Sequence, residues 1–407
     1  MNLVRGRKLY GRYIYTAPVT TGSEEPTDDT ITFLPGMYSV VAYNADGTKT
    51  AIFGNGAENN TIKSLTFELT KTGCGAFSIK FNNLPTMAEL NYKQRIDIFL
   101  FNDSRPWYSG YVTTRPIVGT TETEYTFSGY GFYNLLDKVE IFGTYVNKEV
   151  SVIVRDIAKQ AETKIGIVYN ADKIISTGYT IDTITFNGVT AKEALSQLSD
   201  FAIDYVYGVD TRRNLYFKPR TTTINEQARV WVGKHVDSYV PKWNVEKIVN
   251  WAKVKGNSDT GTEDQWLATV EDTDSQALYG RQESIYTLPT YCTTTDAERW
   301  GQNQINQYKD PIKSATLKTV RLEYPKADGS FSVRKLTTDG LMAIYPLEGE
   351  MQTYPITKLK YSVSADKGIQ LTDLEVGEQP ITIDQYLANL ERVAKNAELL
   401  ASATSST

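Results

Sequence analysis

The sequence predicts an α+β, β-rich protein with several domains: two small β-barrel-like domains related as an internal duplication, an inserted α/β domain, and a C-terminal amphipathic helix. Three observations lead to this prediction. The 407 residues exceed the length that one hydrophobic core usually accommodates. Tyrosine, which suits half-buried strands, occurs 27 times. Short runs in which apolar and polar residues alternate recur along much of the chain.

Composition and charge exclude several classes of protein. Hydrophobic residues make up 41% of the chain and charged residues 22%, as in folded proteins and unlike disordered or collagen-like chains. The net charge of −5 disfavours a general nucleic-acid binder, because phosphate contacts need clustered positive charge. No apolar run reaches the roughly 18–20 residues that span a bilayer, and no apolar signal segment follows the basic N-terminus. We therefore expect no membrane insertion by this chain.

Cysteine and histidine are scarce, which limits the chemistry available. The two cysteines, Cys74 and Cys292, predict free thiols in a reducing compartment, although a bridge between them stays an alternative. The single histidine, His235, leaves little room for zinc sites, Ser-His-Asp triads or Cys-His dyads. We find no phosphate-binding loop or EF-hand pattern either. The sequence therefore predicts no catalytic residue, no metal and no cofactor.

Residues 1–30 are predicted to form an N-terminal arm. Basic and tyrosine side chains alternate in its first half, and such residues are favoured in protein contacts. One interpretation is a frayed terminus, and the other is an arm that orders against a neighbouring subunit. The candidate arm contacts are Arg5, Arg7, Tyr10, Arg12 and Tyr13.

Residues 31–135 are predicted to form the first β-barrel-like domain. In residues 76–81, phenylalanine and isoleucine alternate with polar residues, which is typical of a strand with one buried face. Residues 96–101 are almost continuously apolar, as expected of a strand covered on both faces.

Residues 136–225 are predicted to form the inserted α/β domain. Apolar residues recur at helical spacing over 153–161, and this helix is expected to end near Gly166. Thr190 and Glu193 have the spacing of a capping box, which predicts the start of a second helix. A strand hairpin follows.

Residues 226–380 are predicted to form the second β-barrel-like domain, with one helix inside it. Thr295 and Glu298 have capping-box spacing, and Pro311 is expected to end that helix.

A faint internal echo links the two β-rich regions. Residues 108–129 read as strand, loop, strand and glycine, and residues 354–377 repeat that order. This repetition suggests that the first and last β-domains are copies of one barrel.

Residues 381–407 are predicted to form an amphipathic helix and a disordered tail. Thr382 and Gln385 give a capping-box pair, and two apolar series seven residues apart follow. This seam either packs on its own domain or associates with other copies of the chain. The candidate partner-binding residues are Ile383, Tyr386, Leu390, Val393, Ala397 and Leu400.

The residues leave two functions open. A carboxylate-dependent cell-wall hydrolase needs two acids about 5–9 Å apart, and the candidates are Glu122 with Glu124, or Glu271, Asp272 and Asp274. With 48 acidic residues, such groupings arise by coincidence. A receptor-binding or carbohydrate-binding protein would use exposed aromatic residues, for which 107–108 and 130–133 are the candidates.

The order of several segments resembles a known family. The segments are 75–79, 96–98, 107–112, 191–198, 205–217, 248–256 and 279–283. In this order they resemble the baseplate or tail-tip hub proteins of long-tailed bacteriophages, including the N-terminal hub part of tail-associated lysins. The resemblance covers roughly residues 31–380. No peptidase or glycosidase domain is appended, so we expect a hub alone.

The resemblance implies a homotrimeric structural protein that is not an enzyme. Two similar barrel domains in each of three subunits would present a pseudo-sixfold ring to the sixfold tail tube. The implied partners are the tail tube or distal tail protein, a central spike or fibre protein, and the tape-measure protein, with phage DNA only as transit cargo. The implied location is the tail tip of the virion, assembled in the host bacterial cytoplasm.

Overall fold

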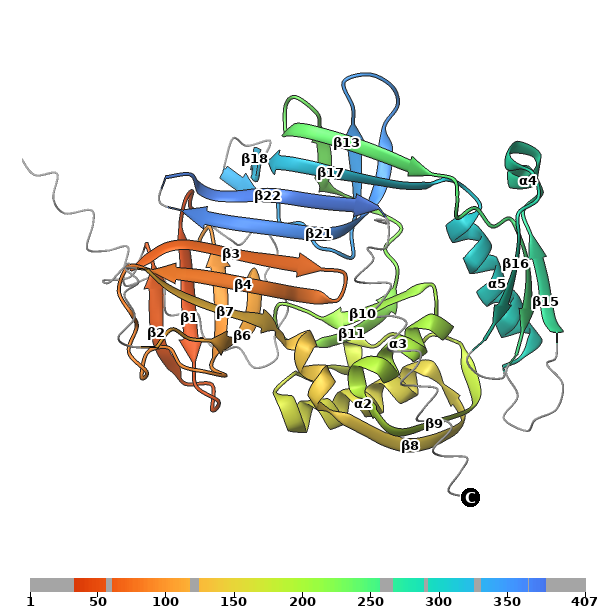
Figure 1. The fold of residues 1–407 in the computed structure, drawn as a ribbon, viewed down its shortest axis with the longest axis horizontal. Helices are drawn as coiled ribbons and strands as arrows, with labels where there is room; N and C mark the ends of the chain where they lie inside the picture. Colours follow the sequence, from red (N-terminus) through yellow and green to blue (C-terminus); the bar gives the residue numbers. More distant parts are fainter. Residues whose placement is uncertain are drawn as a thin grey trace, which may run out of the picture.

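The computed structural model describes residues 33–55, 61–117, 124–256, 266–288, 292–325, 331–364 and 366–377. Within them, one 15-stranded sheet and three smaller sheets are accompanied by four α-helices and two short 3-10 helices. The predicted α+β, β-rich class is therefore confirmed. Figure 1 shows the long sheet on one side, a compact α/β unit beneath it, and a small helix-and-sheet unit at the far edge.

The first β-rich region contributes seven strands to the long sheet. These are β1 (Tyr38–Tyr43), β2 (Lys49–Gly54), β3 (Ile62–Thr70), β4 (Gly73–Phe81), β5 (Arg95–Leu100), β6 (Tyr108–Thr114) and β7 (Tyr125–Gly131). In β4 the side chains of Phe77, Ile79 and Phe81 are buried, while Lys80 is exposed. The alternation read from the sequence therefore assigns the core face of this strand correctly.

The α/β unit follows directly. Its elements are η2 (Phe132–Lys138), β8 (Glu140–Glu149), α2 (Val150–Ile165), η3 (Ala171–Lys173), β9 (Thr180–Thr190), α3 (Ala191–Phe201), β10 (Tyr205–Val209) and β11 (Leu215–Pro219). Helix α2 ends at Gly166, whose φ of 71° places it in the left-handed region that favours glycine. The backbone N–H of Glu193 donates to Thr190 Oγ1, and the Thr190 N–H donates back to the Glu193 carboxylate. The predicted helix end and capping box are both confirmed.

The chain then returns to the long sheet, leaves it to form the small helix-and-sheet unit, and finally comes back to it. This departure is the excursion from the long sheet. The remaining elements are β12 (Ile224–Trp231), β13 (Val236–Asn244), β14 (Trp251–Lys255), β15 (Trp266–Glu271), α4 (Thr273–Tyr279), β16 (Glu283–Thr287), α5 (Thr294–Tyr308), β17 (Ile312–Val320), β18 (Glu323–Pro325), β19 (Phe331–Val333), β20 (Leu341–Tyr345), β21 (Gln352–Ser364) and β22 (Gly368–Gly377).

The start of α5 corrects one prediction from the sequence. Thr293, not Thr295, is the N-cap, and its Oγ1 accepts a hydrogen bond from the Asp296 backbone N–H at 3.1 Å. Three consecutive threonines, residues 293–295, stand at the start of this helix, and two of them have an acidic residue three positions later. The spacing alone therefore could not choose between the two starts.

The long sheet joins the two ends of the described chain. Its main path runs β13-β17-β22-β21-β3-β4-β7-β6-β5-β1-β2, and each neighbouring pair on this path is antiparallel. At the junction, β21 pairs with β3 from Lys358 opposite Thr70 to Ser364 opposite Ser64. Figure 1 shows β21 and β22 lying directly beside β3 and β4.

Two hydrophobic clusters form the interior. The first follows the long sheet and mixes early and late residues; the rings of Phe67 and Tyr361, for example, stack with centroids 4.9 Å apart. The second joins the α/β unit to α5 and to the three-stranded sheet β15-β14-β16. Trp300 of α5 belongs to this second cluster and donates its indole N–H to the Asp200 carbonyl at 2.8 Å.

Candidate functional site

One acid of the first candidate catalytic group, Asp272, serves as a helix cap. Asp272 is the N-cap of α4, where its Oδ1 accepts from the Ser275 N–H at 2.9 Å, and its Oδ2 lies 2.9 Å from Lys309 Nζ. The hydrogen bond from Ser275 and the contact with Lys309 lower the pKa of Asp272. A general acid needs a raised pKa, so this carboxylate has a structural role.

One member of the second candidate pair, Glu124, is also accounted for by local contacts. Glu124 forms ion pairs with Lys63 and Lys80 on an exposed part of the sheet. The hydrogen bond from Lys63 is the main reason that the pKa of Glu124 is lowered. Glu122 lies outside the described residues. Within those residues, no group of three or more His, Cys, Asp or Glu side chains could hold a metal ion.

His235 has structural partners. Its Nδ1 accepts a hydrogen bond from the Trp231 backbone N–H at 3.3 Å and lies 3.4 Å from the guanidinium of the buried Arg334. Burial, followed by the positive charges of Arg334, Lys234 and Arg321, lowers the pKa of His235 to about 4. The imidazole is therefore neutral at physiological pH and holds the turn that leads into β13.

Both cysteines are free, as the sequence predicts, and both are buried. Burial raises the pKa of the Cys74 and Cys292 thiols to about 12. Because the thiolate is the nucleophile, neither residue is suited to covalent chemistry.

The first pair of aromatic residues considered for carbohydrate binding lies in the core. Trp107 and Tyr108 are almost fully buried, and the Trp107 indole N–H donates to Asp103 Oδ2 at 3.1 Å. Lys335, far along the chain, donates to the same oxygen at 2.7 Å. These residues therefore hold the β5–β6 loop against the 331–336 segment.

The predicted partner-binding residues cannot be placed. Both predicted sets lie outside the described residues. They are the C-terminal seam of Ile383, Tyr386, Leu390, Val393, Ala397 and Leu400, and the arm residues Arg5, Arg7, Tyr10, Arg12 and Tyr13.

A sheet edge is a candidate assembly surface instead. Within the described residues, β13 is the last strand at its end of the long sheet, and it pairs with β17. The strand and the residue after it expose three large apolar side chains, Val240, Trp243 and Val245. An exposed edge strand offers unpaired N–H and C=O groups to another strand. Val240 stands between Tyr239 and Pro241, and Trp243 stands between Lys242 and Asn244, so no regular alternation in the sequence indicated that this strand lies at an edge.

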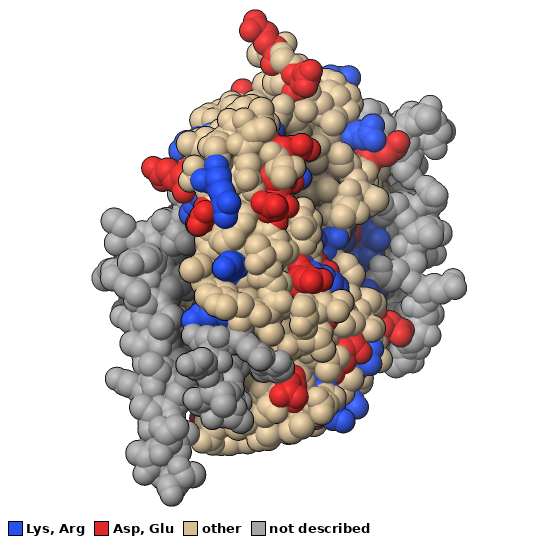
Figure 2. Space-filling model, turned by 90° about the vertical axis from the view of Figure 1, so that its right-hand side faces the viewer, with Lys and Arg blue, Asp and Glu red and all other residues tan. Residues whose placement is uncertain are grey.

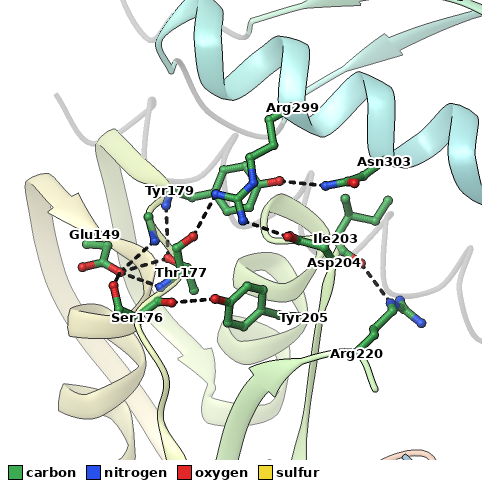
Figure 3. Close-up of polar contacts among 11 residues, drawn as sticks. Glu149, Ser176, Thr177, Tyr179, Ile203, Asp204, Tyr205, Arg220, Arg299 and Asn303 are labelled. Carbon is green, nitrogen blue, oxygen red and sulfur yellow. Dashed lines mark hydrogen bonds and ion pairs between the residues drawn. The ribbon is translucent and has the colours of Figure 1, made fainter. Parts of the chain in front are cut away.

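Arg299 and Asn303 of α5 form a polar clamp with Thr177, Tyr179 and Asp204 of the α/β unit. Figure 3 shows Arg299 of α5 reaching across to the α/β unit. Its guanidinium donates to Asp204 Oδ2 at 2.7 Å and to the Thr177 carbonyl at 2.9 Å, and it lies 3.7 Å from the centroid of the Tyr179 ring. One turn later, Asn303 donates to the Tyr179 hydroxyl at 3.2 Å.

The loop that receives Arg299 is itself held by a carboxylate. Oε1 of Glu149 accepts from Ser176 Oγ at 2.8 Å, from the Thr177 N–H at 2.6 Å and from the Gly178 N–H at 3.0 Å (Figure 3). Burial alone would raise the pKa of Glu149, but these hydrogen bonds outweigh it and lower the pKa to about 2. The chain of contacts therefore runs from Glu149 through the loop to Arg299.

Comparisons with known proteins identify the fold. No protein-family model matches the chain, and no curated protein sequence matches it. Among solved structures, the 43 kDa tail protein of prophage MuSo2 from Shewanella oneidensis superposes with a TM-score of 0.58 at 16% identity, covering 83% of this chain and 98% of that one. The tail protein from Neisseria meningitidis MC58 gives 0.58 at 11% identity, covering 84% and 97%. Prophage tail protein gp18 from Listeria monocytogenes EGD-e gives 0.53 at 12% identity, covering 88% and 99%.

The chain has the fold of prophage tail proteins. The resemblance read from the order of its segments is thus confirmed at the level of the fold. This tail-protein fold extends over most of the chain, because each of the three alignments covers more than four fifths of it. Among the described residues, none of the helices of this tail-protein fold is both long enough and apolar enough to span a bilayer.

Proposed function

We propose that this chain is a structural, non-enzymatic protein of a phage tail tip, and that three copies form a hub. The hub adapts a sixfold tail tube to a threefold spike or fibre and forms part of the conduit for DNA. The fold shared with prophage tail proteins supports a role in the tail. A repeated strand order within the long sheet supports the trimer.

The repeat concerns four strands in each half of the long sheet. The first half runs β3-β4-β7-β6 along the sheet, and the second runs β13-β17-β22-β21. In each half, the fourth strand in chain order lies between the second and the third. The third strand of each half also carries an extra partner on its first few residues, β5 on β6 and β20 on β21. This shared connectivity favours two β-barrel-like modules that arose by duplication.

A glycine at a matching position adds to this support. Gly131 ends β7 and Gly377 ends β22, and each lies against the second strand of its own half. A Cβ atom would come within 2.0 Å of the Cys74 carbonyl at Gly131, and within 2.0 Å of the Lys313 carbonyl at Gly377. Both modules therefore use a glycine for the same close approach of two backbones.

The two modules offer a geometric route to the trimer. Three chains with two equivalent modules each present six similar units, which is what a sixfold tube requires. Within one chain, the third strand of the second module, β21, already pairs with the first strand of the first, β3. By the same relationship, β13 of one copy would lie beside β6 of the next. We take the modules as residues 31–135 and 226–380, with residues 136–225 as the inserted α/β domain.

For the two ends of the chain, the proposal rests on the sequence alone. Residues 1–30 would act as an arm between subunits, and the apolar seam of residues 381–407 would contact the other copies or the spike. The tape-measure protein and the tail tube or distal tail protein would be the further partners.

The test combines mass with cross-linking. Light scattering of the full chain is expected to give three times 45.7 kDa. A variant with Thr114→Cys on β6 and Asn244→Cys on β13 is expected to form covalent trimers with a short bis-maleimide. The native cysteines are buried and contribute little background. A variant with Thr114→Cys and Thr287→Cys, on β16, is the control. A monomer mass at high concentration, or equal cross-linking of both variants, would contradict the proposal.

A further inference from the structure

A groove of about 700 Å³ lies where the second half of the long sheet faces α5 and the turn between α3 and β10. The ends of β13, β17, β21 and β22 form one wall, and α5 forms the opposite wall. Its size falls within the range of about 300–1,000 Å³ that is typical of small-molecule sites. Two or three sugar rings fill such a space.

Aromatic rings stand at the sides of this groove. Trp243 at the end of β13 is 59% exposed, and Tyr279 at the end of α4 is 37% exposed. Lys313, the cross-strand neighbour of Trp243, places its Nζ 4.9 Å from the indole centroid and thereby restrains the ring. Exposed, restrained aromatic rings of this kind stack against the C–H faces of sugar rings, because the ring face is electron-rich and apolar.

Amide side chains line the helical wall. Asn303 and Asn306 lie about one turn apart on α5, and both border the groove. Asn303 is oriented by its hydrogen bond to the Tyr179 hydroxyl, and Asn306 Oδ1 accepts from Gln302 at 3.2 Å. An amide carries both donors and an acceptor, so it can bind a hydroxyl group, which also has both.

The charges around the groove are balanced. Asp204 and Asp310 border the groove together with Arg220 and Lys313, so its lining carries two negative and two positive groups. On the side of the molecule that carries α4 and α5, Figure 2 shows acidic and basic side chains interspersed among many uncharged ones. Clustered charge of one sign would favour an anion or nucleic acid, and here the balance favours an uncharged polar ligand.

Contacts within the protein hold α5, which forms the helical wall of the groove, in place without a ligand. Asp204 borders the groove and at the same time receives Arg299 of α5, so the clamp fixes the helix relative to the α/β unit. Preorganisation of this kind reduces the entropy lost on binding.

We infer that this groove binds a neutral oligosaccharide of two or three sugar rings. Trp243 stacks on one ring, Tyr279 also borders the bound sugar, and Asn303 and Asn306 bind hydroxyl groups. This site goes beyond the structural role proposed above and does not depend on the trimer. Trp243 belongs to the exposed edge strand described above, but the pairing proposed with the next copy uses the backbone of β13, whereas the sugar site uses the Trp243 ring.

The experiment measures binding of three neutral trisaccharides, chitotriose, cellotriose and maltotriose, to the full chain by saturation-transfer NMR and calorimetry. At least one is expected to bind saturably. Trp243→Ala is expected to weaken that binding by at least about tenfold, a loss equivalent to about 1.4 kcal/mol. Asn306→Ala is expected to weaken it less.

The control is Trp266→Ala, on β15, which removes another tryptophan that is 54% exposed but lies away from the groove. Its binding is expected to match that of the unmodified chain, and unchanged circular dichroism would establish that both variants fold. Absence of saturable binding to all three sugars would overturn the inference. Equal losses in Trp243→Ala and Trp266→Ala, or preferential binding of an extended peptide at the groove, would overturn it as well.

Discussion

Arg299 and Asp204 form an ion pair with a 2.7 Å contact, although 95 residues separate them in the chain. The guanidinium also lies against the Tyr179 ring and donates to the Thr177 carbonyl. One side chain thus connects α5, which belongs to the excursion from the long sheet, to three points on the α/β unit. It also fixes one wall of the groove.

Removing this side chain is expected to loosen α5. The ion pair is about one third exposed and screened by solvent, so we expect Arg299→Ala to lower the free energy of unfolding by only about 1–2 kcal/mol. Hydrogen exchange of the α5 amides is expected to speed up in parallel. Arg299→Lys is expected to recover part of the loss, because it keeps the charge but not the planar stacking.

A surface pair supplies the control for the clamp. Lys192 and Asp137 lie 2.9 Å apart and are similarly exposed, but Lys192 connects α3 only to η2, where it also lies 5.3 Å from the centroid of the Tyr133 ring. Lys192→Ala is expected to change stability by less than about 0.5 kcal/mol and to leave α5 exchange unchanged. Equal effects of Lys192→Ala and Arg299→Ala would show that the clamp has no special role.

Glu149 is expected to make the α/β unit sensitive to acid. Its pKa is lowered to about 2 in the fold, so the folded state binds fewer protons than the unfolded state between that value and the ordinary value near 4.3. The stabilisation is therefore complete above about pH 4.3 and is lost as the pH falls towards 2. Urea unfolding followed at several pH values measures this loss.

The matched variant is Glu149→Gln, which keeps the size of the side chain but removes the charge. It is expected to be less stable than the unmodified chain by about 1–2 kcal/mol at pH 7 and to show a flatter dependence between pH 4.3 and 2. An unchanged pH dependence in this variant would assign the acid sensitivity to other carboxylates.

His235 offers a direct measurement, because it is the single histidine in the chain. Its Nδ1 accepts from Trp231 and faces the guanidinium of Arg334, so a proton there would displace a hydrogen bond and meet a positive charge. NMR titration of this imidazole is expected to give a pKa near 4. Because the folded pKa lies below the ordinary value of about 6.5, stability is expected to fall as the pH drops from about 6.5 towards 4. A midpoint near 6.5 would contradict this arrangement.

Gly131→Ala is expected to disrupt the first module. The new Cβ would lie 2.0 Å from the Cys74 carbonyl, which is backbone, so two strands would have to separate. We expect a loss of about 2–4 kcal/mol in the free energy of unfolding. Gly340→Ala is the control, because its nearest neighbour would lie 3.3 Å away. Similar unfolding midpoints for the two variants would show that the close approach is not needed.

Local patterns in the sequence were sufficient wherever the physical cause is itself local. The alternation over residues 76–81 identified the buried face of β4, because successive side chains of a strand point to opposite sides. The Thr190–Glu193 pair and Gly166 identified helix ends, because capping and left-handed backbone depend on residues a few positions apart.

Tertiary structure alone decided what each buried face meets. Periodicity indicates that a strand is covered, but it carries no information on its partner, so the pairing of β21 with β3 could not be derived. Three adjacent threonines gave two equally spaced starts for α5, and only the structure places the N-cap at Thr293. The Arg299–Asp204 pair and the groove beside it arise from segments far apart in sequence, and their meeting depends on the closure of long loops, which no local pattern records.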